Sequence, residues 1–234
     1  MNQNSPRTVI IGASSGFGAA LAEHLAAADH RVLAGSRRER PSTTSLRHVR
    51  LDVSCAQSVS DFAQAADAHL GGQLDGLVFC ASDSGAVARA WEVNTEDAAR
   101  LLDISLLGFV RIVNAFVPTM KNSGRGSIVC VGSQAARTCL GLLSVYGAAK
   151  AGLEHYTRCL AHELHGTGVR ANVIGIAAET DLAQTHRAAK AELRGRPSTH
   201  PPLPPVADNL PLARWLLSDD AAHITGQTIE ARLP

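Results

Sequence analysis

The segment Val9-Ile10-Ile11-Gly12-Ala13-Ser14-Ser15-Gly16-Phe17-Gly18 decides the fold. An apolar run that fits a buried strand enters a turn with three glycines, and the residues that follow, 19–25, are typical of a helix. Glycines in such a turn permit a tight bend and a close approach of the backbone to a ligand, and the N-terminus of a helix favours an anion. This order of strand, turn and helix predicts a binding site for the pyrophosphate of a dinucleotide.

Strands and helices alternate along the rest of the chain. Strands are expected at 8–11, 31–35, 47–51, 74–80, 127–131, 170–176 and 227–231, and helices at 17–28, 56–70, 95–121, 144–165 and 207–217. Pro118 is expected to break the long helix near its end, and residues 177–206 are expected to form a loop. The alternation predicts an α/β fold: a Rossmann-type, doubly wound parallel sheet of about seven strands with helices on both faces.

Length and composition suit one globular unit. The chain has 234 residues, 45% hydrophobic and 18% charged, and no linker divides the pattern, so residues 1–234 are predicted to form a single domain. A formal net charge of +1 gives no bulk attraction to nucleic acid or to an anionic membrane. No apolar run is judged long enough to cross a bilayer, and the polar start of the chain has no secretory pattern, so a cytoplasmic location is expected.

Cysteine and histidine patterns give no metal site. The five cysteines are scattered without a Cys-x-x-Cys pair, which indicates reduced thiols. The run His162-Glu163-Leu164-His165 lacks the His-Glu-x-x-His spacing of a zinc helix, and its histidines are expected to be exposed at a helix end.

Tyr146 and Lys150 stand four residues apart in the expected helix 144–165, so they share one face of it. A phenol has a pKa near ~10, and a neighbouring ammonium lowers that pKa by favouring the phenolate. Such a pair can pass a proton to a carbonyl oxygen while a hydride arrives at the carbon. Tyr-x-x-x-Lys also occurs by chance on helix surfaces, so further residues must support the interpretation.

Ser133 supplies that support, because it lies directly after an apolar strand and thirteen residues before Tyr146. With the glycine turn, Asp52, Ser133, Tyr146 and Lys150 in this order and at these distances, the chain resembles the short-chain dehydrogenase/reductase family. The resemblance covers nearly the whole chain. It implies a dinucleotide-dependent oxidoreductase acting on a small molecule, with residues 177–206 as a substrate loop. It also implies a homodimer or homotetramer packed through the long helix and the catalytic helix.

The resemblance also assigns catalytic roles. Tyr146 would be the general acid in reduction, Lys150 would lower its pKa and hold the nicotinamide ribose, and Ser133 would orient the substrate carbonyl. A simple turn residue is the structural alternative for Ser133. The family's fourth catalytic residue is an asparagine whose backbone carbonyl helps to hold a water, and Ser105 stands in its place. Because a backbone role survives substitution, we expect a slower proton relay and an active enzyme.

Two loops depart from the family pattern. Phe79-Cys80-Ala81-Ser82 replaces Asn-Asn-Ala-Gly, which keeps a small residue but loses the asparagine hydrogen bonds. Ile176-Ala177 replaces Pro-Gly and is one residue short, which makes Thr180 the best match beside the nicotinamide. The predicted cofactor contacts are Gly12, Ser14, Ser15, Gly16, Phe17, Gly18, Arg37, Arg38, Asp52, Val53, Cys80, Ala81, Ser82, Tyr146, Lys150, Ala177 and Thr180.

The residues after the second expected strand favour NADP(H) over NAD(H). An acidic residue there would hold the ribose hydroxyls and repel a 2′-phosphate, whereas this chain has Ser36-Arg37-Arg38-Glu39-Arg40. Guanidinium groups suit a phosphate, and Arg37 falls where the family's phosphate-binding arginine stands. The alternative is a solvated basic loop. Asp52 is predicted to bind the adenine edge, with a helix cap for the following segment as its alternative.

Residues around the expected substrate site do not identify the substrate. Ser82, Asp83, Gln134, Arg137, Leu140 and Leu143 are expected to face it. A basic run in the loop, Arg187, Lys190, Arg194 and Arg196, is either a solvated face or an attractant for an acidic or carrier-linked substrate.

These observations favour an NADP(H)-dependent ketoreductase, an enzyme that reduces a ketone in a biosynthetic pathway. The same scaffold could instead oxidise an alcohol or reduce an imine or enone. A different class of protein, a nucleotide-binding sensor or scaffold without turnover, also fits the altered loops. The intact Ser133, Tyr146 and Lys150 argue against it, because a non-catalytic protein has no chemical need for all three.

Overall fold

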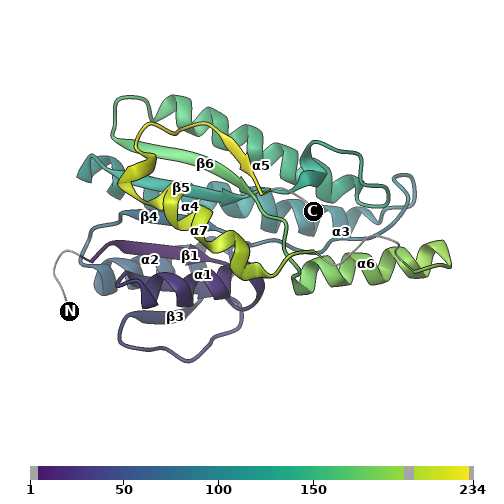
Figure 1. Ribbon diagram of the computed structural model, residues 1–234, viewed down its shortest axis with the longest axis horizontal. Coiled ribbons are helices and arrows are strands. Elements are labelled where there is room, and N and C mark those ends of the chain that lie inside the picture. Colours follow the sequence, from purple (N-terminus) through teal and green to yellow (C-terminus); the bar gives the residue numbers. More distant parts are fainter. Residues whose placement is uncertain (1–4, 198–202, 232–234) are drawn as a thin grey trace.

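The computed structural model describes residues 5–197 and 203–231. Seven parallel strands form one sheet in the order β3-β2-β1-β4-β5-β6-β7 (Figure 1). The strands are β1 (Arg7–Ile11), β2 (Arg31–Ser36), β3 (Leu46–Arg50), β4 (Gly76–Phe79), β5 (Gly126–Val131), β6 (Val169–Gly175) and β7 (Thr228–Glu230). The order reverses between β1 and β4, and an open α/β sheet binds its ligand at the carboxyl end of such a switch point. The predicted fold class is confirmed.

Helices cover both faces of the sheet, as predicted. They are α1 (Gly16–Ala27), α2 (Ala56–Leu70), α3 (Thr95–Leu102), α4 (Gly108–Ser123), α5 (Ser144–Glu163), α6 (Asp181–Arg194) and α7 (Leu210–Leu217). Leu21 of α1 and Leu216 of α7 pack in the core on one face, whereas Phe62 of α2, Phe109 of α4 and Leu153 of α5 pack on the other. The sheet is called doubly wound because the helices between its strands pack on both of its faces and so form these two cores.

The prediction of a loop over residues 177–206 is wrong, because α6 lies within it. Thr180 caps its start, its hydroxyl accepting a hydrogen bond from the Ala183 N–H at 3.2 Å, and Gly195 ends it in the left-handed region with φ of 63°. Only His186 is buried on this helix. Its sequence is mostly polar, with Leu182 and Leu193 as its only large apolar side chains, which is why the hydrophobic pattern did not reveal it.

The long helical region also differs from prediction at two places. Pro118 does not break it, since α4 runs on to Ser123. Pro118 and Asn114, whose carbonyl loses its helical partner, are both exposed, so water can satisfy that carbonyl. Earlier in the region, residues Asp103–Leu107 form a π-helical turn between α3 and α4. Such turns are frequent at functional sites.

The same region corrects the expectation that no apolar run could cross a bilayer. By length and composition alone, Thr95–Ser123 is long and apolar enough to do so, and half of its most apolar window is buried. Phe109, Ile112 and Met120 of this segment are fully buried in the core between α2, α5 and the sheet. Packing in that core accounts for its apolar composition.

Candidate active site

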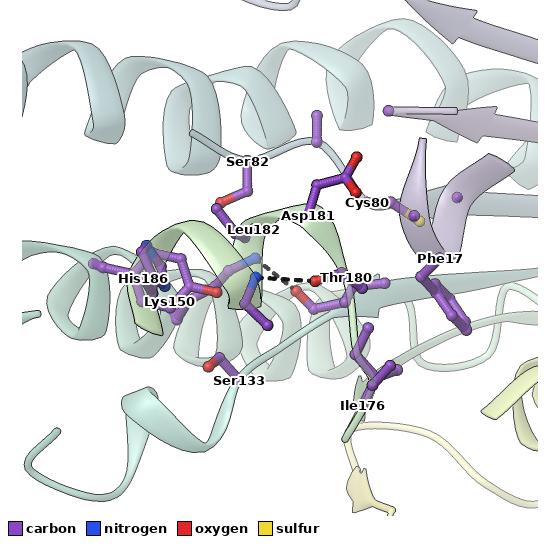
Figure 2. Close-up of a pocket in the computed structure, with 18 of the residues that line it drawn as sticks. Phe17, Cys80, Ser82, Ser133, Lys150, Ile176, Thr180, Asp181, Leu182 and His186 are labelled. Carbon is purple, nitrogen blue, oxygen red and sulfur yellow. Dashed lines mark hydrogen bonds between the residues drawn. The ribbon is translucent and has the colours of Figure 1, made fainter. Parts of the chain in front are cut away.

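A cleft of about 1660 Å³ runs along the carboxyl end of the strands. Its walls come from the glycine turn after β1, the loop after β4, the segment after β5, the start of α5 and the segment from β6 into α6 (Figure 2). All the residues predicted to contact the cofactor line it, and so does Ser133. Ser105 is the exception among the predicted site residues. The roles of all these residues stay predictions, whereas their convergence is a property of the fold.

The glycine turn has room for backbone only. A Cβ on Gly12 would lie 2.6 Å from the Ala81 nitrogen, and Gly12 has φ of 88°. A Cβ on Gly18 would collide with the Gly12 carbonyl oxygen. Two strands and a helix therefore meet without side chains between them, which leaves the N–H groups at the start of α1 facing the cleft. This geometry fits a dinucleotide pyrophosphate.

Tyr146 and Lys150 lie on the first two turns of α5, and both side chains are buried, 8% and 2% exposed. Lys150 Nζ donates to the Val131 carbonyl oxygen at 2.9 Å and lies 5.9 Å from the centroid of the Tyr146 ring. The ammonium is thus fixed close to the phenol by the end of β5. The pair can hold a proton at the phenol oxygen and stabilise its loss.

Ser133 follows β5 and caps the short helical turn Gln134–Ala136, accepting a hydrogen bond from the Ala135 N–H at 3.2 Å. A Cβ on Gly147 of α5 would lie 2.7 Å from the Ala135 carbonyl oxygen. This turn is therefore packed directly on the first turn of α5. The turn interpretation and the catalytic interpretation of Ser133 are compatible, because the capping residue also lines the cleft.

Ser105 is completely buried in the π-helical turn and does not line the cleft. Its hydroxyl lies 3.2 Å from the Ser82 hydroxyl, which does line the cleft. The two serines form a hydroxyl pair in which Ser82 is the half-buried member that reaches the cleft. Any effect of the Ser105 side chain on a bound molecule therefore passes through Ser82.

The adenosine end of the cleft is basic. Arg37 and Arg38 are exposed and line the cleft, whereas Arg40 points elsewhere and pairs with Glu23 at 2.9 Å. Ser36 Oγ donates to the Arg38 carbonyl oxygen at 2.6 Å, which fixes the turn that carries both arginines. Two guanidinium groups are therefore available to an anion beside the end of β2.

Asp52 does not cap the following helix. The N-cap of α2 is Cys55, without a side-chain hydrogen bond, so that alternative is wrong. Asp52 Oδ1 instead accepts from the Ser54 hydroxyl at 2.6 Å and from the Ser54 N–H at 3.0 Å. The hydroxyl hydrogen bond is the main cause that lowers the pKa of Asp52. The carboxylate stays ionised next to Val53, at the place predicted for the adenine edge.

The altered loops keep their shape by other contacts. Cys80 takes the place of an asparagine, and burial raises the pKa of its thiol to about 12, opposed by the positive charge of Lys150. It is a neutral, space-filling group beside Gly18. In the other loop, Asn209 fixes Ala177, with its amide nitrogen donating to the Ala177 carbonyl oxygen at 2.9 Å. Thr180 lies against the glycine turn, 3.6 Å from where a Gly16 Cβ would stand.

His186 is a cleft residue that the sequence interpretation missed. It comes from α6 and packs edge-on against the Tyr146 ring, with centroids 4.9 Å apart and planes at 75°. Its Nε2 lies 2.7 Å from the Ser84 carbonyl oxygen, and burial is the main cause that lowers its pKa. The neutral ring therefore bridges α6 and the loop after β4, beside Tyr146. The available signal was its spacing of four residues from Lys190 and eight from Arg194, which places the three on one face of a helix.

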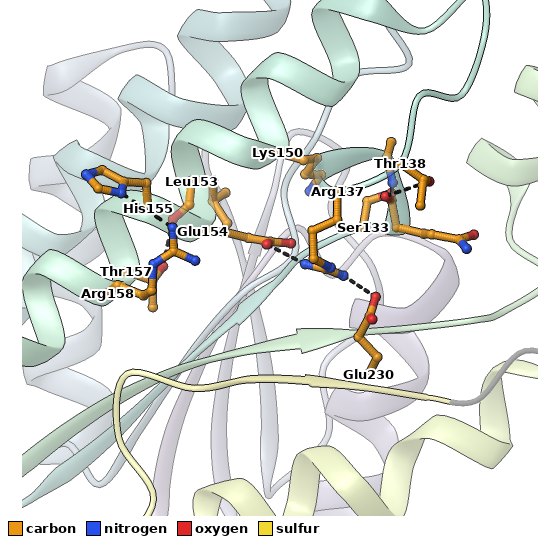
Figure 3. Close-up of polar contacts among 12 residues, drawn as sticks. Ser133, Arg137, Thr138, Lys150, Leu153, Glu154, His155, Thr157, Arg158 and Glu230 are labelled. Atoms are coloured by element: carbon orange, nitrogen blue, oxygen red, sulfur yellow. Dashed lines mark hydrogen bonds and ion pairs between the residues drawn. The ribbon is translucent and has the colours of Figure 1, made fainter.

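Two residues expected to face the substrate do not line the cleft. Arg137 forms ion pairs with Glu154 of α5 and Glu230 of β7 (Figure 3). Asp83 Oδ1 accepts from the Gly85 N–H at 2.8 Å and so shapes its own loop. The other four residues of that expected set do line it: Ser82, Gln134, Leu140 and Leu143. Among the described residues, no group of three or more His, Cys, Asp or Glu side chains could hold a metal ion.

Comparison with known proteins places this geometry in context. A family model described as short chain dehydrogenase matches residues 7–191. A protein of Streptomyces virginiae, named as a ketoacyl reductase of the monensin polyketide synthase, is 31% identical over 98% of this chain and 97% of its own length. An NAD(+) 2-dehydro-3-deoxy-L-rhamnonate dehydrogenase of Sphingomonas is 33% identical over 71% of this chain and 69% of its own. A crystal structure of an actinorhodin polyketide ketoreductase variant with NADPH has a TM-score of 0.87 over 98% of this chain and 97% of its own, at 22% identity, and so shares the fold.

Proposed function

Because this chain belongs to the short-chain dehydrogenase/reductase family of oxidoreductases, we propose that it uses NADP(H) to reduce a ketone to a secondary alcohol in a biosynthetic pathway. One observation carries the proposal: Ser133, Tyr146 and Lys150 line one cleft with the glycine turn. The relative named as a ketoacyl reductase supports the direction and the pathway.

The side chains divide the work as follows. Tyr146 gives its phenol proton to the carbonyl oxygen, and Lys150, held by the Val131 carbonyl, stabilises the phenolate that remains. Ser133 donates a hydrogen bond to the same oxygen and orients it. The glycine turn, Arg37 and Asp52 would hold the dinucleotide, which supplies the hydride when bound.

Arg37 supports NADP(H) over NAD(H). It is exposed at the end of β2, without an ion pair among the described residues, where a 2′-phosphate would lie. Relatives and neighbours of this chain carry names with either nucleotide, so the preference rests on this residue.

The test is Tyr146→Phe, with Tyr156→Phe as the matched control. Tyr156 lies on the same helix and packs edge-on against Phe109. Loss of the proton donor should lower turnover of ketones with NADPH by roughly 10²- to 10⁴-fold. NADPH affinity, measured by fluorescence titration, should change little in either variant. Unchanged turnover in Tyr146→Phe would sink the assignment.

A second function, nucleotide binding without turnover, draws on one observation: Ser105 is sealed behind Ser82 and replaces a catalytic residue of the family. Tight NADPH binding, together with no turnover of ketones, alcohols, imines or enones by the native protein, would favour it.

We also propose a homodimer or homotetramer. Leu107, between α3 and α4, is 48% exposed, which supports packing through that long helical region. A native mass of two or four chains is expected, and a cytoplasmic location stays a prediction.

A further inference from the structure

One wall of the outer cleft is a basic face of α6. His186, Lys190 and Arg194 follow one another at intervals of four residues, so they share one face of the helix. All three line the cleft, whereas Glu192 and Leu193 of the same helix do not. The cleft-facing side of α6 is therefore positive, and it begins at the catalytic tyrosine, on which His186 packs.

The helical rise gives the distances of Lys190 and Arg194 from His186 along this face. At ~1.5 Å rise per residue, the Lys190 backbone lies roughly 6 Å beyond His186, and that of Arg194 roughly 12 Å beyond it. Across the cleft stands the segment after Ser133: a Cβ on Gly141 would lie 3.6 Å from Arg194 Nη2. Arg194 thus faces the opposite wall.

These cations are not part of the predicted dinucleotide site. Thr180, at the start of α6, is the residue that lies against the glycine turn. Lys190 is ten residues further along the helix, roughly 15 Å away at the helical rise. A pyrophosphate at the glycine turn would leave Lys190 and Arg194 without an anion.

Carboxylates of the described residues also leave their charge uncompensated. Arg187, on the same helix, is held by both oxygens of Glu179, at 2.9 and 2.8 Å. Within residues 5–197 and 203–231, no ion pair joins Lys190 or Arg194 to a carboxylate. Burial, and then the charge of Arg194, lower the pKa of Lys190, which means that the surroundings disfavour its charged form. A bound anion would stabilise that charged form.

We infer that Lys190 and Arg194 bind an anionic group of the substrate, a carboxylate or a phosphate, at positions roughly 6 and 12 Å along α6 from His186, the residue that packs on Tyr146. The substrate class is then a ketone joined to its acid group by a chain of several bonds. This inference rests on the proposed ketone reduction, and it decides between the two interpretations of the basic run in favour of substrate binding.

The experiment compares three ketones of matched length with NADPH: 7-oxooctanoate, its methyl ester and 6-oxoheptyl phosphate. A hydrogen-bonded charge is worth about 1.5–3 kcal/mol, so the native enzyme should prefer an anion to the ester in kcat/KM by about 10- to 100-fold. Added sodium chloride should reduce that preference. The better of the two anions identifies the acid group.

Lys190→Gln and Arg194→Gln should each raise KM for the anionic ketones by a much larger factor than KM for the ester. The matched control is Arg158→Gln, which removes the same charge from an exposed arginine of α5 that does not line the cleft. Equal kcat/KM for acid and ester in the native enzyme would overturn the inference. An equal loss in Arg158→Gln would also overturn it, since the effect would then follow net charge.

The failure of the proposed function can be separated from failure of the inference. If none of the three ketones is turned over, titration calorimetry on the NADPH-bound protein still measures their binding. Tighter binding of the anions, lost in Lys190→Gln, would support the anion site in a protein that lacks this activity. Equal binding of acid and ester would refute the anion site.

Discussion

Arg37 is the single residue on which the nucleotide preference depends. Replacing it with alanine removes a charged hydrogen-bond donor worth about 1.5–3 kcal/mol, so Arg37→Ala should weaken NADPH binding by about 10- to 100-fold. NADH, which has no 2′-phosphate, should bind as before. Fluorescence titration with each nucleotide measures both.

Arg40→Ala is the control for this prediction, because Arg40 belongs to the same loop but is held by Glu23. It should leave both affinities close to native. If Arg37→Ala weakened NADH and NADPH equally, Arg37 would be stabilising the loop and not reading a phosphate.

At this scale the sequence predicted well wherever function is tied to a local motif. The glycine turn, Ser133, Tyr146 and Lys150 follow strand and helix ends at the spacing of the family that the chain resembles, so the resemblance predicted that they would share one cleft. Ser105 and Arg137 could not be placed in this way. Whether a side chain faces the cleft there depends on a π-helical turn and on partners distant in sequence, Glu154 and Glu230.

At the scale of elements, Arg137 joins three parts of the molecule: the segment after Ser133, α5 and β7. Glu154 is 3% exposed and sits one turn after Lys150, and its Oε1 has no hydrogen-bond partner among the described residues. Arg137→Gln would leave that carboxylate buried without a counter-charge. Because the Arg137 side chain is 33% exposed, we expect a loss of about 2–3 kcal/mol in the free energy of unfolding, measured with urea.

The double variant Arg137→Gln/Glu154→Gln provides the matched comparison. With both charges removed, most of the lost stability should return, because no charge stays buried alone. Arg100→Gln, which breaks an exposed pair with Asp97, should cost much less. If the single Arg137→Gln variant had the same free energy of unfolding as the native protein, water would already screen the charge of Glu154.

The same scale explains why α6 was missed and the buried helices were not. Helices that bury large apolar side chains, such as Phe62 of α2 and Leu153 of α5, can be recognised from the apolar content of their sequence. The sequence of α6 carries only cap signals, Thr180 and Gly195, around alanines and charges. Its cleft face carries His186, Lys190 and Arg194 and not large apolar side chains, so hydrophobicity cannot reveal it.

For the whole molecule, the histidines set the response to acid. Burial is the main cause that lowers the pKa of His30, His48, His69 and His186 below the ordinary value of 6.5. As pH falls through 6.5, the unfolded chain therefore binds protons that the folded protein does not, and stability is lost. We expect Tm to fall between about pH 7 and 5.

Differential scanning calorimetry across that range tests the expectation. His69→Gln should make the fall shallower, because it removes one of the groups whose pKa is lowered by burial. A Tm that rises as the pH falls from 7 to 5 would contradict the conclusion that buried histidines set the response to acid. The lowered pKa of Asp52 acts in a separate window, since its contribution is lost only below about its ordinary value of 3.8.

The global topology was the most predictable feature, because it depends on alternation summed over many residues and tolerates errors at each boundary. The strand order, by contrast, is known only from the structure, since pairing is decided by contacts between segments far apart in the chain.

The link between Glu230 and Arg137 also has a practical side for anyone producing this protein. The last strand ends beside the cleft, and Ala231 lines it. A purification handle or reporter fused after this strand would start next to the cleft. Arg7, at the start of β1, lies at the opposite, amino end of the parallel sheet. Fusions for assay work therefore belong at the amino terminus.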